Sequence, residues 1–126
     1  MKIRVYYEDT DAAGIVYYAN YLKFCERARS EVFFEAGRTP QSEEGYLVVK
    51  HLEADYRYPA TLGDILHVDT KLIEKRKASI TLLQRVEKDG KTLFEMTIRL
   101  AFLKEGRPVK IPDSVYSVIS AWESGI

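Results

Sequence analysis

The sequence predicts an α+β domain in which a five-stranded antiparallel sheet wraps around one long helix, followed by a short C-terminal helix. One stretch, residues 17–36, carries apolar residues at the three-to-four-residue spacing of a helix. Five other stretches, one before it and four after it, read as strands, most clearly where the two-residue alternation is regular. Because helix and strands are segregated along the chain, an antiparallel sheet is favoured over alternating βαβ units.

Length and composition indicate a single domain spanning residues 1–126. Lys and Arg number 19 and so do Asp and Glu, which gives no overall charge to steer the protein toward nucleic acid or an anionic membrane. No apolar run approaches the roughly 18 residues that span a bilayer, and no signal peptide is expected from the acidic turn after residue 7. The single cysteine, Cys25, excludes an intrachain disulfide and fits a reducing compartment, so we expect a cytoplasmic protein.

The elements follow in order along the chain. Residues 2–8 alternate apolar and polar side chains and predict a half-buried strand. The helical stripe of residues 17–36 ends at Gly37, a plausible C-terminal cap, with Pro40 shortly after to prevent continuation. Strands are predicted over residues 46–57, 64–75, 79–88 and 92–103, with a hairpin at Asp89-Gly90. The tail after Pro112 has the spacing of a short amphipathic helix.

A sheet wrapped around a single helix leaves one face and two strand edges without cover. Exposed edges are templates for pairing with another chain, and soluble oligomers are mostly symmetric assemblies of identical copies. We therefore expect a homo-oligomer, either a dimer or a tetramer built as a dimer of dimers.

The densest cluster of chemically capable residues lies in residues 6–21, YYEDTDAAGIVYYANY. Asp9 and Asp11 stand in a short loop that leads directly into the predicted helix. The free N–H groups of a first helical turn attract negative charge, so a carboxylate beside them is a base next to an anion-binding site. That combination suits attack on an acyl carbonyl. The alternative is that these residues only cap the helix and form a turn.

Calcium binding is a second interpretation of the same loop. Asp9, Asp11 and Gly14 match the first, third and sixth positions of an EF-hand loop. The match fails further on, because Ala13 stands at the fifth position and Asn20 at the twelfth, where a bidentate Glu is needed. The preceding segment is also predicted to be a strand rather than a helix.

The same segment resembles the signature of the hotdog-fold acyl-CoA thioesterases of the 4-hydroxybenzoyl-CoA thioesterase type, in particular their Tol-Pal-associated bacterial group. The shared residues are Tyr7, Asp9, Asp11, Gly14, Val16, Tyr17, Asn20 and Tyr21, followed by Glu26, Arg27, Ala28 and Arg29. The predicted order of strands and helices also suits a hotdog fold, so the resemblance covers nearly the whole chain.

The resemblance implies hydrolysis of an acyl-CoA thioester without a metal or organic cofactor. Asp11, the second aspartate of the D-x-D-x-x-G motif, would be the catalytic carboxylate, as general base or as nucleophile. Backbone N–H groups around Tyr17 and Tyr18 would polarise the thioester carbonyl. Residues expected to shape the substrate site are Tyr7, Gly14 and Asn20. The chain departs from many members of the Tol-Pal-associated group, which carry His where it has Tyr18.

A basic corner between two predicted strands resembles the region where family members meet the phosphates of coenzyme A. It contains Lys75, Arg76 and Lys77, with Ser79 beside them. Lys and Arg donate charge-assisted hydrogen bonds to phosphate groups. The alternative is a solvated hairpin end with no ligand.

Other classes of function fit less well. No G-x-S-x-G motif is present, and His51 and His67 lie in predicted strands, which speaks against a serine hydrolase. Cys25 lies on the apolar stripe of the helix, where free cysteines are usually inert. Hotdog dehydratases use a helix histidine that this helix lacks. A non-catalytic acyl-CoA-binding or regulatory hotdog protein stays open as the alternative, although it would not need Asp11.

Overall fold

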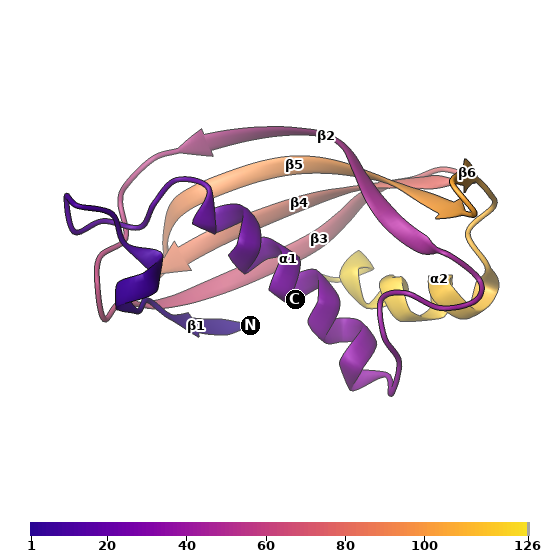
Figure 1. Ribbon diagram of the computed structural model, residues 1–126, viewed down its shortest axis with the longest axis horizontal. Coiled ribbons are helices and arrows are strands. Elements are labelled where there is room, and N and C mark those ends of the chain that lie inside the picture. The colour runs from indigo at the N-terminus through magenta and orange to yellow at the C-terminus, as the bar shows by residue number, and fades with distance from the viewer. Residues whose placement is uncertain (126) are drawn as a thin grey trace.

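The computed structural model of the protein describes residues 1–125 and contains one sheet and one long helix (Figure 1). The strands are β1 (Lys2–Arg4), β2 (Tyr46–Tyr56), β3 (Ile65–Lys75), β4 (Ser79–Lys88), β5 (Lys91–Lys104) and β6 (Arg107–Pro108). The helices are α1 (Asn20–Glu35) and α2 (Asp113–Ile119), with 3₁₀ turns η1 (Tyr7–Asp9) and η2 (Ser120–Glu123). Neither α-helix is long and apolar enough to cross a membrane, as far as residues 1–125 show.

The sheet is antiparallel throughout and has the order β1-β3-β4-β5-β2, with the two-residue β6 paired to the end of β5. The prediction of five main strands is confirmed, and β6 is a small addition. The turn between β4 and β5 is the expected Asp89-Gly90 hairpin, with φ of 50° and 78° at the two residues. Positive φ at both central positions is what a type I′ turn requires.

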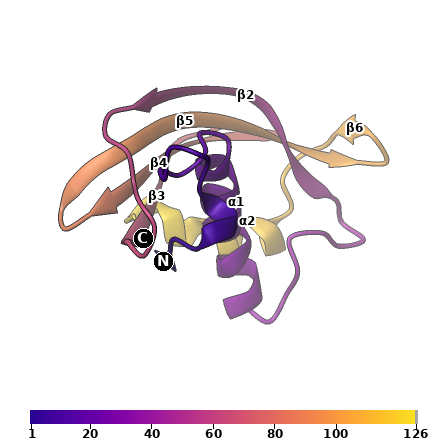
Figure 2. The same ribbon diagram turned by 60° about the vertical axis from the view of Figure 1, so that its left-hand side comes forward.

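The sheet curves over α1, which lies against its concave face (Figure 2). The buried side of α1 shares one hydrophobic core with apolar side chains of β3, β4 and β5, and Leu47, Leu52 and Ala54 of β2 pack against it. Residues of α2 and η2 complete this core. The largest fully buried side chains include Trp122, Phe24, Phe94 and Phe102. The wrapped arrangement inferred from one long helix beside several strands is therefore confirmed.

The beginning of the chain differs from the prediction in two respects. The first strand ends at Arg4 instead of continuing to residue 8, and α1 begins at Asn20 instead of residue 17. Asp9 causes the first difference, because its carboxylate accepts the Tyr6 N–H at 2.9 Å and its own N–H donates to the Tyr6 carbonyl at 3.0 Å. Such local side-chain bonds compete with strand pairing and turn the backbone into η1.

The end of α1 matches the prediction. Gly37 has φ of +74°, its N–H donates to the Phe34 carbonyl, and the Arg38 N–H donates to the Phe33 carbonyl, each at 2.9 Å. This pattern ends a helix with a left-handed residue, a conformation that glycine adopts without steric cost.

Candidate active site

The loop between η1 and α1 is a tight turn that projects Asp11. The Asp11 N–H donates to the Ile15 carbonyl at 2.9 Å, and the Gly14 N–H donates to the Asp11 carbonyl at 3.0 Å. Thr10 and Val16 form an isolated antiparallel bridge at the base of the turn. Gly14 has φ of +80°, so a residue without a side chain serves the turn here. These backbone contacts therefore fix the position of the Asp11 main chain.

The Asp11 carboxylate is solvent-accessible and only partly engaged. Its Oδ1 accepts the Ala13 N–H at 2.8 Å, which is an Asx turn within the loop. The structure gives no hydrogen bond to Oδ2 among residues 1–125, so that oxygen is available to accept a proton.

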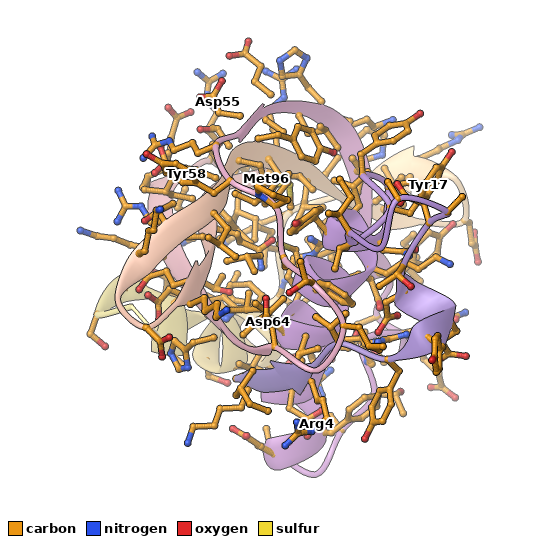
Figure 3. All side chains as sticks on the ribbon, turned by 90° about the vertical axis from the view of Figure 1, so that its left-hand side faces the viewer. Arg4, Tyr17, Asp55, Tyr58, Asp64 and Met96 are labelled. Carbon is orange, nitrogen blue, oxygen red and sulfur yellow. The ribbon has the colours of Figure 1, made fainter. Side chains whose placement is uncertain are left out.

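Asp11 lines a cleft with a volume of about 390 Å³. The other lining residues come from the same loop, the first turn of α1 and the segment that follows β2, and they are Ile15, Val16, Tyr17, Tyr18, Tyr21, Tyr56, Arg57, Tyr58 and Pro59. Figure 3 views this end of the molecule, with Tyr17 on one side and Tyr58 on the other. The predicted catalytic carboxylate is thus beside a cleft rather than in open solvent.

Aromatic rings form most of the cleft wall. The centroids of the Tyr17 and Tyr18 rings are 4.9 Å apart, and Tyr56 lies edge-on to Tyr18 at 6.2 Å and to Tyr21 at 5.6 Å. Tyr21 in turn stacks on Phe94 of the core at 5.0 Å. The wall is therefore anchored to the hydrophobic core through ring contacts.

Two hydroxyl groups of this wall hold the backbone around the cleft. The Tyr56 hydroxyl donates to the Tyr18 carbonyl at 2.8 Å, and the Tyr21 hydroxyl accepts the Ala60 N–H at 3.1 Å. Burial raises the pKa of both phenols above the ordinary value. Both side chains are therefore neutral at physiological pH, and the Tyr56 hydroxyl keeps the proton that it donates.

The start of α1 bears on the predicted oxyanion donors. The Tyr17 N–H donates to the Asp9 carbonyl at 2.9 Å, so this amide is occupied in the structure, and its role as an oxyanion donor stays a prediction. The Tyr18 N–H, in contrast, donates to no group within residues 1–125. Because the Tyr56 hydroxyl binds the Tyr18 carbonyl, it restrains this residue at the mouth of the cleft.

Asn20 and Asp9 connect the loop to the helix instead of contacting the cleft. Both side chains are buried, and the Asn20 amide donates to the Asp9 carbonyl at 2.9 Å. This contact suits a positioning role, and the expectation that Asn20 binds substrate stays a prediction. The buried Asp9 carboxylate accepts the Tyr6 N–H, and no group of three His, Cys, Asp or Glu side chains placed to hold a metal ion occurs in residues 1–125.

The remaining predicted substrate residues do not line the cleft within one chain. Tyr7 is 83% exposed on η1, and Gly14 serves the turn. Arg76 and Lys77 lie in the β3–β4 turn, and Ser79 begins β4, at the β6 end of the sheet, whereas the Asp11 loop lies at the other end (Figure 1). One chain alone therefore does not bring the basic corner and the carboxylate together.

Sequence reasoning gave no site role to Tyr21 of the cleft wall, to Tyr56 at the end of β2, or to Arg57 and Tyr58 directly after it. The signal that could have found the last three is the tyrosine-rich YRYP segment at a strand end, where loops carry functional side chains.

Cys25, the single cysteine of the chain, does not line the cleft. Cys25 is fully buried, and burial raises the pKa of its thiol to about 12.

The two histidines, His51 and His67, lie away from the cleft as well. His51 and His67 are about half exposed, and each pairs with a carboxylate two residues along its own strand, at 3.2 Å and 3.0 Å. Neither lines the cleft beside Asp11. A serine hydrolase arrangement is therefore absent from the cleft as residues 1–125 define it.

A wrapped sheet around one helix, with an acidic loop at the helix start, defines a hotdog domain. The model of the thioesterase-like superfamily matches residues 5–119, and the chain belongs to this family. Solved structures agree: a hypothetical protein from Aquifex aeolicus superposes with a TM-score of 0.87 at 26% identity, covering 94% of this chain and 96% of that one. A Thermus thermophilus thioesterase, complexed with coenzyme A and zinc, superposes with a TM-score of 0.83 at 29% identity, covering 98% and 92%.

Two named proteins are similar to this chain in sequence. The acyl-CoA thioesterase YbgC of Helicobacter pylori is 51% identical over 86 residues, which cover 68% of this chain and 65% of that relative's length. The acyl-CoA thioesterase YbgC of Haemophilus influenzae is 43% identical over 119 residues, which cover 90% of this chain and 88% of that relative.

Proposed function

We propose that this protein is a thioester hydrolase that converts an acyl-CoA to a free acid and coenzyme A. The observation that carries the proposal is that the Asp11 carboxylate and the residue with a free amide, Tyr18, line the same cleft. The names of the relatives, which describe acyl-CoA thioesterases, support the same substrate class. A cytoplasmic location remains the expectation from the single cysteine.

The reaction needs a base and a group that receives the charge on the carbonyl oxygen. With Asp11 as general base, water loses a proton to Oδ2 while its oxygen bonds to the thioester carbon. The negative charge that develops on the carbonyl oxygen is stabilised by the Tyr18 N–H. When the C–S bond breaks, the thiolate of coenzyme A leaves with the electron pair and takes up a proton, and the acid remains. Direct attack by Asp11 would instead pass through an anhydride that water opens.

These two groups supply enough stabilisation for a thioester, which is an activated acyl group. A positioned base contributes roughly 10²–10⁴-fold and one oxyanion donor roughly 10²–10³-fold. If the terms add, the barrier falls by about 5–10 kcal/mol.

A second copy of the chain would complete the substrate site. β2 is one of the two edge strands of the sheet, and its end at Tyr56 lies by the cleft while its start at Tyr46 lies near β6. Antiparallel pairing of β2 with β2 of a second copy would bring that copy's β3–β4 turn toward the cleft. Arg76 and Lys77 of that turn would then meet the phosphates of coenzyme A, and the acyl group would lie along α1.

The experiment is release of free thiol from a panel of aliphatic and aromatic acyl-CoAs. Turnover of at least one substrate supports the proposal, and the panel at the same time assigns the acyl preference. Tight binding of acyl-CoA, measured by calorimetry, with no thiol released from any substrate would overturn it in favour of a non-catalytic acyl-CoA-binding protein.

A further inference from the structure

A second cavity, of about 280 Å³, lies between α1 and β2 and is separate from the Asp11 cleft. Its walls are mostly apolar or aromatic and come from Phe33, Pro40, Tyr46, Leu47, Val49 and Leu100. Glu26 and Arg29 of α1 are the charged residues that line it within residues 1–125. The cavity borders β2, an edge strand of the sheet, where Val49 is 45% exposed.

Arg29 is held by a buried polar network and is attracted by Glu26, three residues earlier on the same helix, without a direct ion pair within residues 1–125. Its Nη1 donates to the side-chain oxygen of Gln84 at 2.9 Å, and Gln84, which is fully buried, donates to the Cys25 carbonyl and the Thr70 hydroxyl at 3.1 and 3.0 Å. No carboxylate within residues 1–125 forms an ion pair with Arg29. Burial lowers the pKa of this guanidinium. A part-buried cation is costly unless an anion lies in direct contact, and Glu26 of the same chain does not reach that distance, which points to a closer anion from outside the chain.

Glu26 is in the complementary situation. Its Oε1 accepts a hydrogen bond from the Ser30 hydroxyl at 2.8 Å, and no Lys, Arg or His of residues 1–125 forms an ion pair with it. Glu26 stands six residues after the first residue of α1, and Arg29 stands six residues before the last. The two charges are therefore placed symmetrically about the middle of the helix.

This symmetry identifies the missing partner. If the β2 strands of two copies pair, the two-fold axis between them reverses the direction of every element that runs along the sheet. The two copies of α1 would therefore run antiparallel. In an antiparallel pair centred on the helix middle, each residue faces the one at the same distance from the opposite end. We propose that Arg29 of one copy binds Glu26 of a second copy, twice in each dimer, and that these two ion pairs fix how the copies align.

A two-fold contact must be self-complementary, and a patch with one unpaired cation and one unpaired anion meets that requirement. The inference rests on the assembly proposed above but not on the thioesterase activity. The alternative occupant of the cavity is a small anionic ligand held by Arg29 alone, which would leave Glu26 without a function there.

The test reverses the charges of Arg29 and Glu26, singly and together, and measures the mass of the protein in solution. Sedimentation equilibrium and light scattering would measure the dimer dissociation constant of wild type, Arg29→Glu, Glu26→Arg and the double variant. Each single reversal places like charges across the seam and is expected to raise the constant by at least about 100-fold. The double variant restores opposite charges and is expected to recover most of the loss.

Matched controls lie on the same helix. Arg27→Glu reverses an exposed arginine about 200° around α1 from Arg29, and Glu31→Arg reverses an acid that lines a different cavity. Both are expected to remain dimeric. Circular dichroism would establish that every variant folds, and if a reversal unfolds the chain, Arg29→Gln, Glu26→Gln and their double variant would give the coupling energy of the pair instead.

Three outcomes would overturn the inference: a monomeric wild type, single reversals that stay dimeric, or a folded double variant that stays as dissociated as the singles. Loss of acyl-CoA hydrolysis in Arg29→Glu with an unchanged mass would overturn it in favour of a ligand site. Thiol release is measured separately in each case, so failure of the assembly is distinguished from failure of the proposed activity.

Discussion

The side-chain amide of Asn20, on the first turn of α1, donates a hydrogen bond of 2.9 Å to the backbone carbonyl of Asp9 in η1. The same carbonyl accepts the Tyr17 N–H at 2.9 Å. The segment between these anchors contains both Asp11 and Tyr18. These contacts at the Asp9 carbonyl therefore tie the loop that carries the proposed base to the start of α1, directly after the proposed oxyanion donor Tyr18.

Asn20→Asp tests this positioning role, because it keeps the size of the side chain but replaces the donor with a carboxylate facing a carbonyl. We expect the free energy of unfolding in urea to fall by about 1–3 kcal/mol. We also expect kcat for thiol release to fall more than KM rises, since the catalytic groups lose alignment. Lys23→Gln, an exposed change in the next turn of α1, is the control and is expected to leave both unchanged. A variant with normal kcat would contradict the role.

Cys25 is predicted to be an inert core residue. Burial raises its thiol pKa to about 12, so the reactive thiolate is scarce at neutral pH. The native protein at pH 8 should not react with a disulfide reagent, and denatured protein should react fully. Because the folded pKa exceeds the unfolded one, this thiol stabilises the fold below about pH 9 and the contribution is lost as pH rises toward about 12. Fast labelling of native protein with loss of turnover would make Cys25 a catalytic candidate again.

Asp64 is predicted to make the fold sensitive to acid at the turn next to the cleft. Burial by itself raises its pKa, but hydrogen bonds from Lys88 at 2.8 Å and from Thr61 at 2.8 Å outweigh burial, so the pKa is lowered. A depressed carboxyl pKa gives stability that is present above the unfolded value and is lost as pH falls through the folded value. Asp64→Asn should therefore lower the free energy of unfolding at pH 7 by on the order of 1 kcal/mol, with the difference shrinking below about pH 4.

A urea titration of wild type and Asp64→Asn between pH 7 and pH 3 measures this directly. Asp113→Asn, an acidic residue of α2 at a distance from this turn, serves as the control for general charge effects. A difference between wild type and Asp64→Asn that stays constant over this range would show that the carboxylate charge does not stabilise the turn.

The basic corner is predicted to bind the coenzyme rather than the acyl group. Arg76→Ala combined with Lys77→Ala removes two cations from the β3–β4 turn, and we expect KM for acyl-CoA to rise about 10-fold or more with little change in kcat. Inhibition by free coenzyme A should weaken in parallel, while a short thioester without the nucleotide should be hydrolysed as by wild type. Lys71→Ala, in the middle of β3, is the matched loss of charge. Unchanged KM in the double variant would mean that the corner is a solvated hairpin end.

The sequence predicted much of the fold because its signals are local. Helical spacing, the Gly37 cap and the Asp89-Gly90 hairpin each depend on a few neighbouring residues, and the structure agrees with all three. The early end of β1 was missed because the Asp9 carboxylate captures the Tyr6 N–H, a choice between two local bonds that periodicity does not report.

The candidate site was predictable only in part. The loop-to-helix pattern indicated Asp9 and Asp11 together, and the family resemblance implied Asp11 and the amides around Tyr17 and Tyr18. The availability of an amide depends on its partner, and the Tyr17 N–H is taken by the Asp9 carbonyl. Tyr56 and Tyr58 reach the cleft from the end of β2, more than 35 residues along the chain, through sheet pairing that composition does not specify. The place of Arg76 depends on a second copy of the chain.

The most direct measurement is thiol release by wild type and Asp11→Asn on the best acyl-CoA of the panel, together with calorimetric binding of the same substrate's product. The substitution keeps the size and the Ala13 hydrogen bond but removes the base. We predict a kcat at least about 100-fold lower, with unchanged product binding and an unchanged circular dichroism spectrum. Comparable kcat in the two proteins would contradict the account, because the carboxylate would then take no part in breaking the thioester.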